Sequence, residues 1–371
     1  MEKAINKTTL ISGASIAGLS AAWFMNNLGY KVTVVENAAA LRDSGAAIDI
    51  RDNTVEIVKR MGILEQLKQY SLHVENISFK NADDTTAGSI TMPEEEAHTD
   101  IEIERDKFIR IVYESIKSDV EFIFNDSITA LEQADEYITA TFRNAEERNF
   151  DLVIGADGAH STVRRICFGP EADYAHFLQA YFSITTVDKL LIAEKQMQMY
   201  NEPDRAITLN AYNGKTDIIF CFYADTEIGY DYRDSNRHKQ IIAEAFANVG
   251  WRAPELLDEA LASPNFYFDK FCQVKMPEWT KGRVALIGDA AYCASPAAGM
   301  GGSLAIEGAA ALADALQKCN GDHEVAFLHY NKTLRPFIEQ VQAQAEFNVR
   351  NNFIPRTEEA IRKRNEEAKM F

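Results

Sequence analysis

The first forty residues contain a glycine-rich turn between an apolar strand and a helix, and this feature constrains the fold more than any other. Residues 8–12 predict a short buried strand, residues 16–28 a helix, and residues 30–36 a second strand with valines at alternate and adjacent positions. A strand, helix and strand in this order form a β-α-β unit with parallel strands and a helix over one face. The chain is therefore expected to contain a doubly wound α/β domain.

The turn itself has the spacing of a dinucleotide-binding site. Gly13 would permit the tight turn, Gly18 would let helix and strand pack closely, and Glu36 ends the second strand, where its carboxylate would accept hydrogen bonds from ribose hydroxyls. The helix N-terminus would offer N–H groups and a positive dipole to a pyrophosphate. The residues expected to line this site are Gly13, Ser15, Ile16, Ala17, Gly18 and Glu36.

Ser15 departs from the dinucleotide fingerprint, because it stands where the middle glycine is expected. Its side chain would either hold the backbone slightly away from the phosphate or hydrogen-bond the phosphate through its hydroxyl. A purely structural turn is the alternative to dinucleotide binding. The strand, the helix, the second strand and its terminal acid together favour dinucleotide binding over that alternative.

Two further glycine-bearing turns follow buried strands. Residues 151–155 predict a strand that leads into Asp157-Gly158 and a basic helix start, which alone would indicate only a turn. Residues 283–287 predict another strand, and Gly288-Asp289 follow at its carboxyl end, where α/β sheets bind ligands. A glycine-rich stretch follows this third turn and contains Pro296, Gly299, Gly301 and Gly302. It leads into a helix whose N-terminus would face a negative group.

Between these turns the chain predicts sheet. Residues 121–124, 128–131 and 137–142 predict three strands of a meander, and residues 181–223 are rich in aromatic and β-branched side chains, which favours an antiparallel sheet. Residues 235–262 and 324–349 predict helices. The nucleotide-type unit is thus interrupted by sheet insertions and revisited.

Composition excludes several classes of protein. The net charge of −18 argues against nucleic acid and membrane partners, and no apolar run reaches the length of a membrane span. The five cysteines are scattered without C-x-x-C spacing, so neither a disulfide framework nor a metal site is expected, and a reducing cytoplasm fits best. No signal peptide is expected either. The oligomeric state is not predicted.

Together the three glycine-bearing segments resemble the FAD fingerprint, the Asp-Gly motif and the Gly-Asp motif of group A flavin-dependent monooxygenases. That family includes para-hydroxybenzoate hydroxylase and the tetracycline-inactivating monooxygenases. The resemblance covers residues 8–345 and keeps the family's order and spacing. It implies an α/β fold in which a Rossmann-like FAD-binding domain is interleaved with an antiparallel-sheet substrate domain, followed by a C-terminal helix.

On this basis the FAD-binding domain is expected to comprise residues 1–71, 101–175 and 276–320. The substrate domain would comprise residues 72–100 and 176–275, and residues 321–371 would form a C-terminal helical segment.

The resemblance also assigns roles to single residues. Glu36 resembles the acid that binds the adenosine ribose, Arg105 the FAD-contacting arginine on a helix, and Asp289 the aspartate that binds the ribitol chain. Asp49 resembles a flavin-side contact of the tetracycline-inactivating members.

Three positions are less settled. Asp157 resembles a residue that serves both FAD and NADPH, and Arg42 resembles an NADPH contact, although a solvated surface arginine is an equal interpretation. Tyr292 stands where many members carry histidine. Because tyrosine does not titrate near neutrality, a proton-moving role at this position is doubtful.

The implied chemistry belongs to the cofactors. NAD(P)H reduces the flavin, molecular oxygen adds to form a flavin C4a-hydroperoxide, and one hydroxyl passes to a small aromatic or polycyclic, antibiotic-like substrate. No side chain is assigned as catalytic. Tyr212, Phe220 and Phe222 are candidate substrate-lining residues, although aromatic side chains on strands more often belong to plain core.

Two alternatives stay open. A flavin-dependent halogenase is disfavoured, because the Trp-x-Trp-x-Ile-Pro pattern of those enzymes is absent from this sequence. A flavin-dependent reductase would consume NAD(P)H without inserting oxygen. A non-catalytic protein that binds FAD or a drug would not oxidise NAD(P)H at all.

Overall fold

The computed structural model describes residues 7–41, 45–92, 100–231 and 233–368. Its contacts divide the chain into two compact units, which are described separately. Unit 1 comprises Met1–Ser71, Ile103–His176 and Gln273–Gln342, and unit 2 comprises Leu72–Glu102, Phe177–Cys272 and Ala343–Phe371. No separate C-terminal segment results from this division, because residues 321–342 group with unit 1 and the rest with unit 2.

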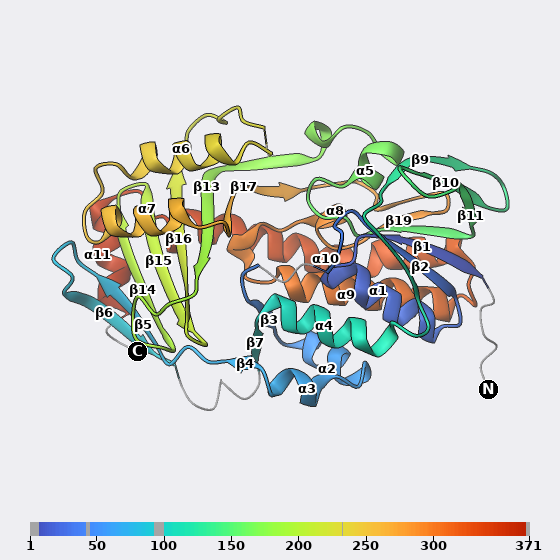
Figure 1. Cartoon of the computed structure of the whole chain (residues 1–371), viewed down its shortest axis with the longest axis horizontal. Helices are drawn as coiled ribbons and strands as arrows, with labels where there is room; N and C mark the ends of the chain where they lie inside the picture. Colours follow the sequence, from blue (N-terminus) through green and yellow to red (C-terminus); the bar gives the residue numbers. More distant parts are fainter. Residues whose placement is uncertain (1–6, 42–44, 93–99, 232, 369–371) are drawn as a thin grey trace. The chain divides into compact units, whose positions relative to one another are not determined.

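Unit 1 is built on a six-stranded sheet with the strand order β18-β19-β12-β1-β2-β8 (Figure 1). All neighbouring strands are parallel except the edge pair β18 and β19. The inner strands are buried almost throughout, as strands covered on both faces must be. The strands are β1 (Thr8–Ser12), β2 (Lys31–Glu36), β8 (Glu121–Phe124), β12 (Leu152–Gly155), β18 (Thr280–Lys281) and β19 (Val284–Leu286).

Helices α1 (Ile16–Asn27), α4 (Arg105–Ile116) and α9 (Gly301–Lys318) lie side by side in unit 1, with α1 packed against both others (Figure 1). Both α1 and α9 are rich in alanine and glycine, and small side chains of this kind let two helices approach closely. The shorter helices here are α2 (Asn53–Arg60), α3 (Leu64–Lys68), α5 (Thr162–Cys167), α8 (Asp289–Tyr292) and the 3-10 turns Glu171–Asp173 and Pro296–Ala298.

A three-stranded antiparallel sheet follows β8, in the order β11-β10-β9. Its strands are β9 (Ile128–Gln133), β10 (Ile138–Phe142) and β11 (Arg148–Phe150). The predicted meander is therefore wrong in its first strand, since Glu121–Phe124 pairs in parallel with β2. The short apolar sequence of β8 does not reveal which strand it pairs with. Helix α4 precedes β8 and provides the crossover connection that a parallel pairing with β2 requires.

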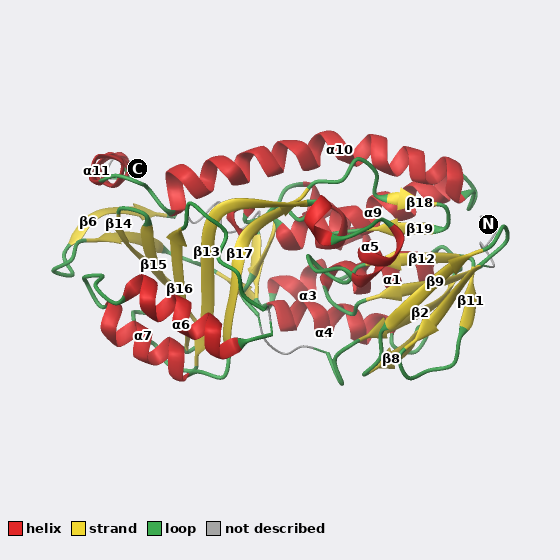
Figure 2. Ribbon diagram, turned by 90° about the horizontal axis from the view of Figure 1, so that it is seen from above, coloured by secondary structure: helices red, strands yellow, loops and turns green. Residues whose placement is uncertain are grey.

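Unit 2 contains a seven-stranded sheet with the order β17-β13-β16-β15-β14-β5-β6 (Figure 2). The strands from β13 to β16 are antiparallel, which confirms the sheet predicted over residues 181–223, and β5 joins β14 in parallel. The strands are β5 (Asn76–Lys80), β6 (Thr86–Thr91), β13 (Ala175–Val187), β14 (Gln196–Glu202), β15 (Arg205–Tyr212), β16 (Lys215–Tyr223) and β17 (Phe266–Val274).

Helices α6 (Ser235–Phe246) and α7 (Ala253–Ala262) cover one face of this sheet (Figure 2). Their apolar stripes, including Ile242 and Phe246, pack on alternate strand residues such as Ile207 and Phe220 to form the core of unit 2. The remaining helices are α10 (His323–Asn348), a π-helical turn (Val349–Phe353) and α11 (Glu358–Glu367).

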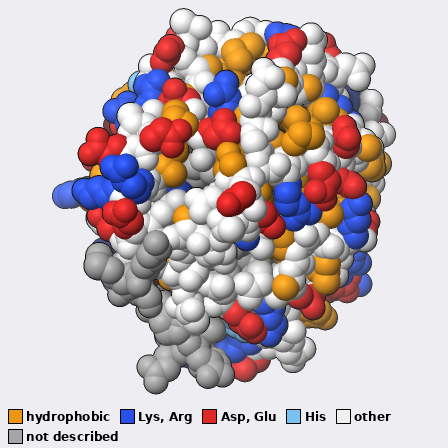
Figure 3. Space-filling model, turned by 90° about the vertical axis from the view of Figure 1, so that its left-hand side faces the viewer, with side chains coloured by type: hydrophobic (Ala, Val, Ile, Leu, Met, Phe, Trp, Pro, Cys, Tyr) orange, Lys and Arg blue, Asp and Glu red, His pale blue; other side chains and the backbone are white. Residues whose placement is uncertain are grey.

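A last small sheet has the order β3-β7-β4, formed by β3 (Ile48–Ile50), β4 (Ser71–Leu72) and β7 (Ile101–Ile103). On the face in Figure 3, acidic and basic side chains are interspersed. Among the described residues, the exposed ion pairs include that of Arg356 with Asp204 at 2.8 Å. Within the described residues, no helix is both long and apolar enough to cross a bilayer.

Candidate cofactor site at the carboxyl edge of the unit 1 sheet

Four adjacent parallel strands of unit 1, in the order β19-β12-β1-β2, present the sequence motifs at their carboxyl ends. Gly288-Asp289 follow β19, Asp157-Gly158 follow β12, and Gly13 follows β1, while Glu36 ends β2. Parallel strands bring their carboxyl ends to one edge, where ligands bind in open α/β sheets. Segments far apart in the sequence are thereby gathered at one edge.

The first turn is packed too tightly for any residue but glycine. Gly13 has a φ of +104°, and a Cβ built on it would lie 2.6 Å from the carbonyl oxygen of Ala156. A Cβ on Gly18 would lie 1.9 Å from the carbonyl oxygen of Gly13. Gly18 therefore lets helix α1 pack on the turn itself, and the first and second motifs are in contact.

Glu36 supports the first turn from the end of β2. Its two carboxylate oxygens accept hydrogen bonds from the backbone N–H groups of Ala14 and Ala38, each at 2.8 Å. These bonds fix the carboxylate beside the turn while leaving further lone pairs for a ligand.

Asp157 organises the second turn. Its carboxylate accepts hydrogen bonds from the backbone N–H groups of Thr162 at 2.9 Å and Val163 at 3.1 Å, and from the Ser161 hydroxyl. Burial raises the pKa of Asp157, and these hydrogen bonds act in the opposite direction. Gly158 has a φ of +84° with open space where a Cβ would lie, so it is required for its backbone conformation.

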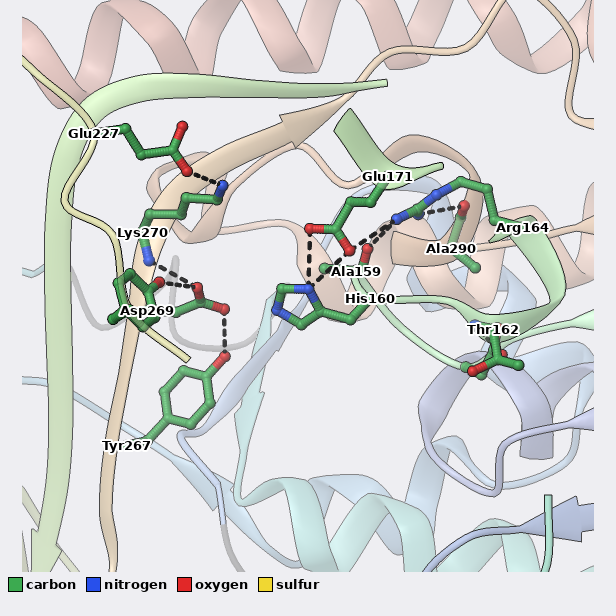
Figure 4. Close-up of polar contacts among 12 residues, drawn as sticks. Ala159, His160, Thr162, Arg164, Glu171, Glu227, Tyr267, Asp269, Lys270 and Ala290 are labelled. Atoms are coloured by element: carbon green, nitrogen blue, oxygen red, sulfur yellow. Dashed lines mark hydrogen bonds and ion pairs between the residues drawn. The ribbon is translucent and has the colours of Figure 1, made fainter. Parts of the chain in front are cut away.

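Arg164 is a structural residue that sequence reasoning missed. It is only 1% exposed and donates to the carbonyl oxygens of Ala159 and, at 2.9 Å, Ala290 (Figure 4). Glu171 lies 3.6 Å from its guanidinium and also pairs with His160 at 2.9 Å. Arg164 thus joins the second motif to the third. The adjacent Arg165 is exposed, and nothing in the residue types separates the two positions.

The third turn contacts the first. Gly288 has a φ of +58°, and a Cβ on it would lie 3.1 Å from the Cβ of Ala17 in α1. The N–H of Ile287 donates to the carbonyl oxygen of Gly155 at 3.0 Å, which continues the pairing with β12 to the edge of the sheet. With the contacts above, each of the three turns touches the other two.

Asp289 begins helix α8 and lies exposed at this edge. The surrounding protein nevertheless desolvates its carboxyl and raises its pKa, while Arg105 and a hydrogen bond with Cys293 lower it. Such a carboxylate is suited to binding ligand hydroxyls.

Arg105 is the first residue of helix α4, and its guanidinium donates to the hydroxyl of Ser15 at 2.7 Å. A Cβ on Gly45 would lie 3.0 Å from the Cδ of Arg105, so this glycine leaves space for the arginine stem. Arg105 therefore stands beside the first turn and within electrostatic reach of Asp289.

The stretch after α8 exposes Pro296, Gly299 and Gly301, while Gly302 is buried. A Cβ on Gly302 would lie 2.9 Å from the Cβ of Ile48, and one on Gly299 would lie 3.8 Å from a carboxylate oxygen of Asp49. Asp49 itself pairs with Arg51 at 3.0 Å. The structure thus brings Asp49 to the glycine-rich stretch. Ser295 belongs to the same stretch and has a strained backbone conformation with a φ of +81°, which its sequence does not indicate.

Other candidate residues lie elsewhere. Arg42 is outside the described residues. Phe220 and Phe222 point into the core beneath α6 and α7, where Phe220 contacts Phe246 edge-on. Tyr212 is buried, and its hydroxyl donates to Asp217 at 2.9 Å. Phe220 and Phe222 lie in the core because alternate residues of β16 face the helices.

Tyr292 is fully buried, and its hydroxyl lies 3.2 Å from that of Tyr330. Burial raises the pKa of Tyr292 to about 12, so it does not titrate near neutrality. Its role is packing against α9, where Gly308 leaves room for the ring.

We expect Glu307→Gln to stabilise the protein at pH 7 by about 1 kcal/mol. Glu307 of α9 is buried and accepts a hydrogen bond from Thr54 at 2.7 Å, and burial raises its pKa. A raised folded-state pKa favours the protonated form, so this carboxyl stabilises the fold most at low pH and loses that contribution as pH rises. The gain should therefore shrink toward pH 4 in urea unfolding, whereas Glu56→Gln on the surface of α2 should change nothing. A gain independent of pH would contradict this assignment.

Comparison with known proteins agrees with this geometry. The sequence matches the family described as "FAD binding domain" over residues 6–345. A flavin-dependent monooxygenase of Legionella longbeachae is 32% identical, covering 91% of this chain and 87% of the relative, and an uncharacterized protein of Mycobacterium tuberculosis is 36% identical, covering 92% and 94%. The crystal structure of the tetracycline destructase Tet(55) superimposes with a TM-score of 0.87 at 32% identity, covering 98% of this chain and 95% of that one.

The fold and the three turns define an FAD-binding oxidoreductase, as predicted. The chain belongs to the group A flavin-dependent monooxygenases, a family that includes the tetracycline destructases. The predicted interleaving of a Rossmann-like domain with an antiparallel sheet is confirmed.

Proposed function

We propose that this protein is an NAD(P)H-dependent hydroxylase that uses FAD and molecular oxygen to add a hydroxyl group to a small aromatic or polycyclic, antibiotic-like substrate. The observation that carries the proposal is the convergence of three mutually contacting turns at one sheet edge, beside the exposed carboxylate of Asp289. The similarity to Tet(55) supports the substrate class.

The residues at the sheet edge fit FAD. We assign the adenosine ribose to Glu36, the pyrophosphate to the N-terminus of α1 and to Arg105, and the ribitol chain to Asp289. The flavin ring is assigned to Asp49 and the exposed stretch of Pro296, Gly299 and Gly301. Asp157, whose carboxylate caps α5, would support the FAD site through Gly158.

When bound, FAD supplies the electron transfer from NAD(P)H and the activation of oxygen. The protein supplies position and charge. The N-terminus of the eighteen-residue helix α9 begins at Gly301 without a side-chain cap, so its N–H groups and dipole are available to stabilise negative charge on a reduced flavin. No side chain is assigned a proton-transfer role.

For the substrate we propose the face of the unit 2 sheet opposite α6 and α7. Tyr212, Asn210 and Asp217 lie on this face, because their neighbours Leu209 and Ile218 belong to the core beneath the helices. The amide oxygen of Asn210 is buried and has no hydrogen-bond partner among the described residues. A buried acceptor of this kind suits a substrate that donates a hydroxyl or amide proton. Phe220 and Phe222 are not part of this proposal.

The function is tested by incubating purified holoprotein with NADH or NADPH and a panel of phenols and tetracyclines. Substrate-stimulated oxidation of the nucleotide, with one oxygen atom added to the product by mass spectrometry, is expected. Nucleotide oxidation with a reduced product would instead indicate the flavin-dependent reductase. Failure to oxidise either nucleotide under any condition would indicate a binding protein.

We expect Asp289→Ala to weaken FAD binding by about tenfold or more, because hydrogen bonds to a charged group contribute about 1.5–3 kcal/mol. Titration of apoprotein with FAD, followed by flavin fluorescence, measures this. Asp314→Ala, an exposed aspartate near the other end of α9, is the control and should bind FAD normally. Equal affinity of the Asp289→Ala variant would remove Asp289 from the site.

A further inference from the structure

We infer that Ser15 is a positioning residue for FAD. Its hydroxyl does not cap helix α1 but holds Arg105 against the pyrophosphate site. The inference rests on the proposed placement of FAD at the sheet edge. It also decides between the two effects that the departure from the glycine fingerprint allows, in favour of a serine that strengthens the site.

Ser15 occupies the N-cap position of α1 but forms no side-chain cap hydrogen bond. Serine is strongly preferred at N-caps because its oxygen accepts a hydrogen bond from one of the first N–H groups of the helix. Here the hydroxyl oxygen instead accepts a hydrogen bond from Arg105 at 2.7 Å. The first N–H groups of α1 therefore stay available to an anion.

Arg105 is held from several directions. It begins helix α4, which packs directly on α1, and its stem passes Gly45. The guanidinium also lies near enough to Asp289 of the third turn to lower the pKa of that carboxyl. The hydrogen bond to Ser15 connects the guanidinium to the first turn, at the N-terminus of α1. A cation placed there faces the same ligand position as the helix N-terminus.

The hydroxyl of Ser15 links the arginine to the anion chemically. A serine hydroxyl has one proton and two lone pairs. With a lone pair occupied by Arg105, its proton remains available to a phosphate oxygen, and a hydrogen bond to an ionised group is stronger than a neutral one. Ser15, Arg105 and the N–H groups of α1 together form an anion cradle that suits a pyrophosphate.

Ser15→Gly tests this inference, because it restores the fingerprint glycine. Loss of the Arg105 anchor should weaken FAD binding to apoprotein by about tenfold or more. The apoprotein itself should keep its thermal stability, since replacing an N-cap serine by glycine costs only a few tenths of a kcal/mol. Ser15→Thr retains the hydroxyl and should retain most of the affinity.

A double-mutant cycle separates positioning from general damage to the turn. In an Arg105→Gln background, Ser15→Gly should reduce FAD affinity by clearly less than it does in the unaltered protein, because the hydroxyl no longer anchors an arginine and only its own hydrogen bond to the phosphate is lost. Ser20→Ala on the same helix removes a buried hydroxyl that has no hydrogen-bond partner among the described residues, and it should leave FAD affinity unchanged.

Two results would overturn the inference. The first is unchanged or tighter FAD binding by Ser15→Gly, as the fingerprint alone suggests. The second is an equal loss of affinity in the Arg105→Gln background. Both differ from failure of the proposed function, in which the unaltered protein would bind FAD but add oxygen to no substrate, and from failure of the proposed FAD placement, in which it would bind no FAD.

Discussion

Replacing Arg164 with methionine should destabilise the protein by about 3–5 kcal/mol, the usual cost of breaking a buried charged network. Arg164 donates to carbonyl oxygens of Ala159 and Ala290 and lies near Glu171. Methionine fills similar volume but leaves these acceptors buried without a donor. Urea unfolding monitored by circular dichroism measures the loss. Because Ala290 follows Asp289, FAD affinity should fall as well.

Arg165→Met is the matched control. The two arginines are adjacent on α5, but Arg165 is exposed, so its replacement should change stability by less than about 0.5 kcal/mol. If both variants lost the same stability, or if Arg164→Met unfolded like the unaltered protein, Arg164 would not be the link between the second and third turns.

Gly308→Ala should cost about 3 kcal/mol, even though alanine favours a helix by about 1 kcal/mol over glycine. A Cβ on Gly308 would lie 1.7 Å from the hydroxyl oxygen of Tyr292. That ring is fully buried and also packs edge-on against Trp279, so it has little room to move aside. Thermal unfolding of the apoprotein should show a lower midpoint.

Tyr292→Phe provides the corresponding rescue. Removing the hydroxyl alone should cost about 1 kcal/mol, through the hydrogen bond with Tyr330. In the Gly308→Ala background the same change should restore a large part of the lost stability, because the closest clashing atom is gone. Additive losses of stability in the double variant would show that the Tyr292 hydroxyl is not what excludes a side chain at position 308. Rescue would establish Tyr292 as a packing residue.

The sequence predicted the parts of the fold that follow from local chemistry. The first β-α-β unit, the strands before Asp157 and Asp289, and the antiparallel sheet have strong period or turn signals. The partner of β8 did not follow, since a run such as Glu121–Phe124 is equally compatible with a meander and with a parallel edge. Pairing of this kind depends on a crossover helix and on burial in three dimensions.

The site shows the same division. Gly13, Gly18 and Gly288 were identified from the spacing of the motifs, and the structure shows that close packing or a positive φ requires glycine there. Arg164 and the Ser15–Arg105 contact were not, because side chains separated by many residues meet only once the sheet is assembled. Phe220 and Phe222 show the reverse problem, since aromatic character does not reveal which face of a strand is buried in the core.

The central claim is that the three turns of unit 1 bind a single FAD, and a crystal structure of the FAD complex tests it most directly. We expect one continuous FAD density per chain, with the adenosine ribose on Glu36, the pyrophosphate between Arg105 and the start of α1, and the ribitol chain on Asp289. Density for FAD at another place, or crystals grown with saturating FAD that show none along this edge, would contradict the account.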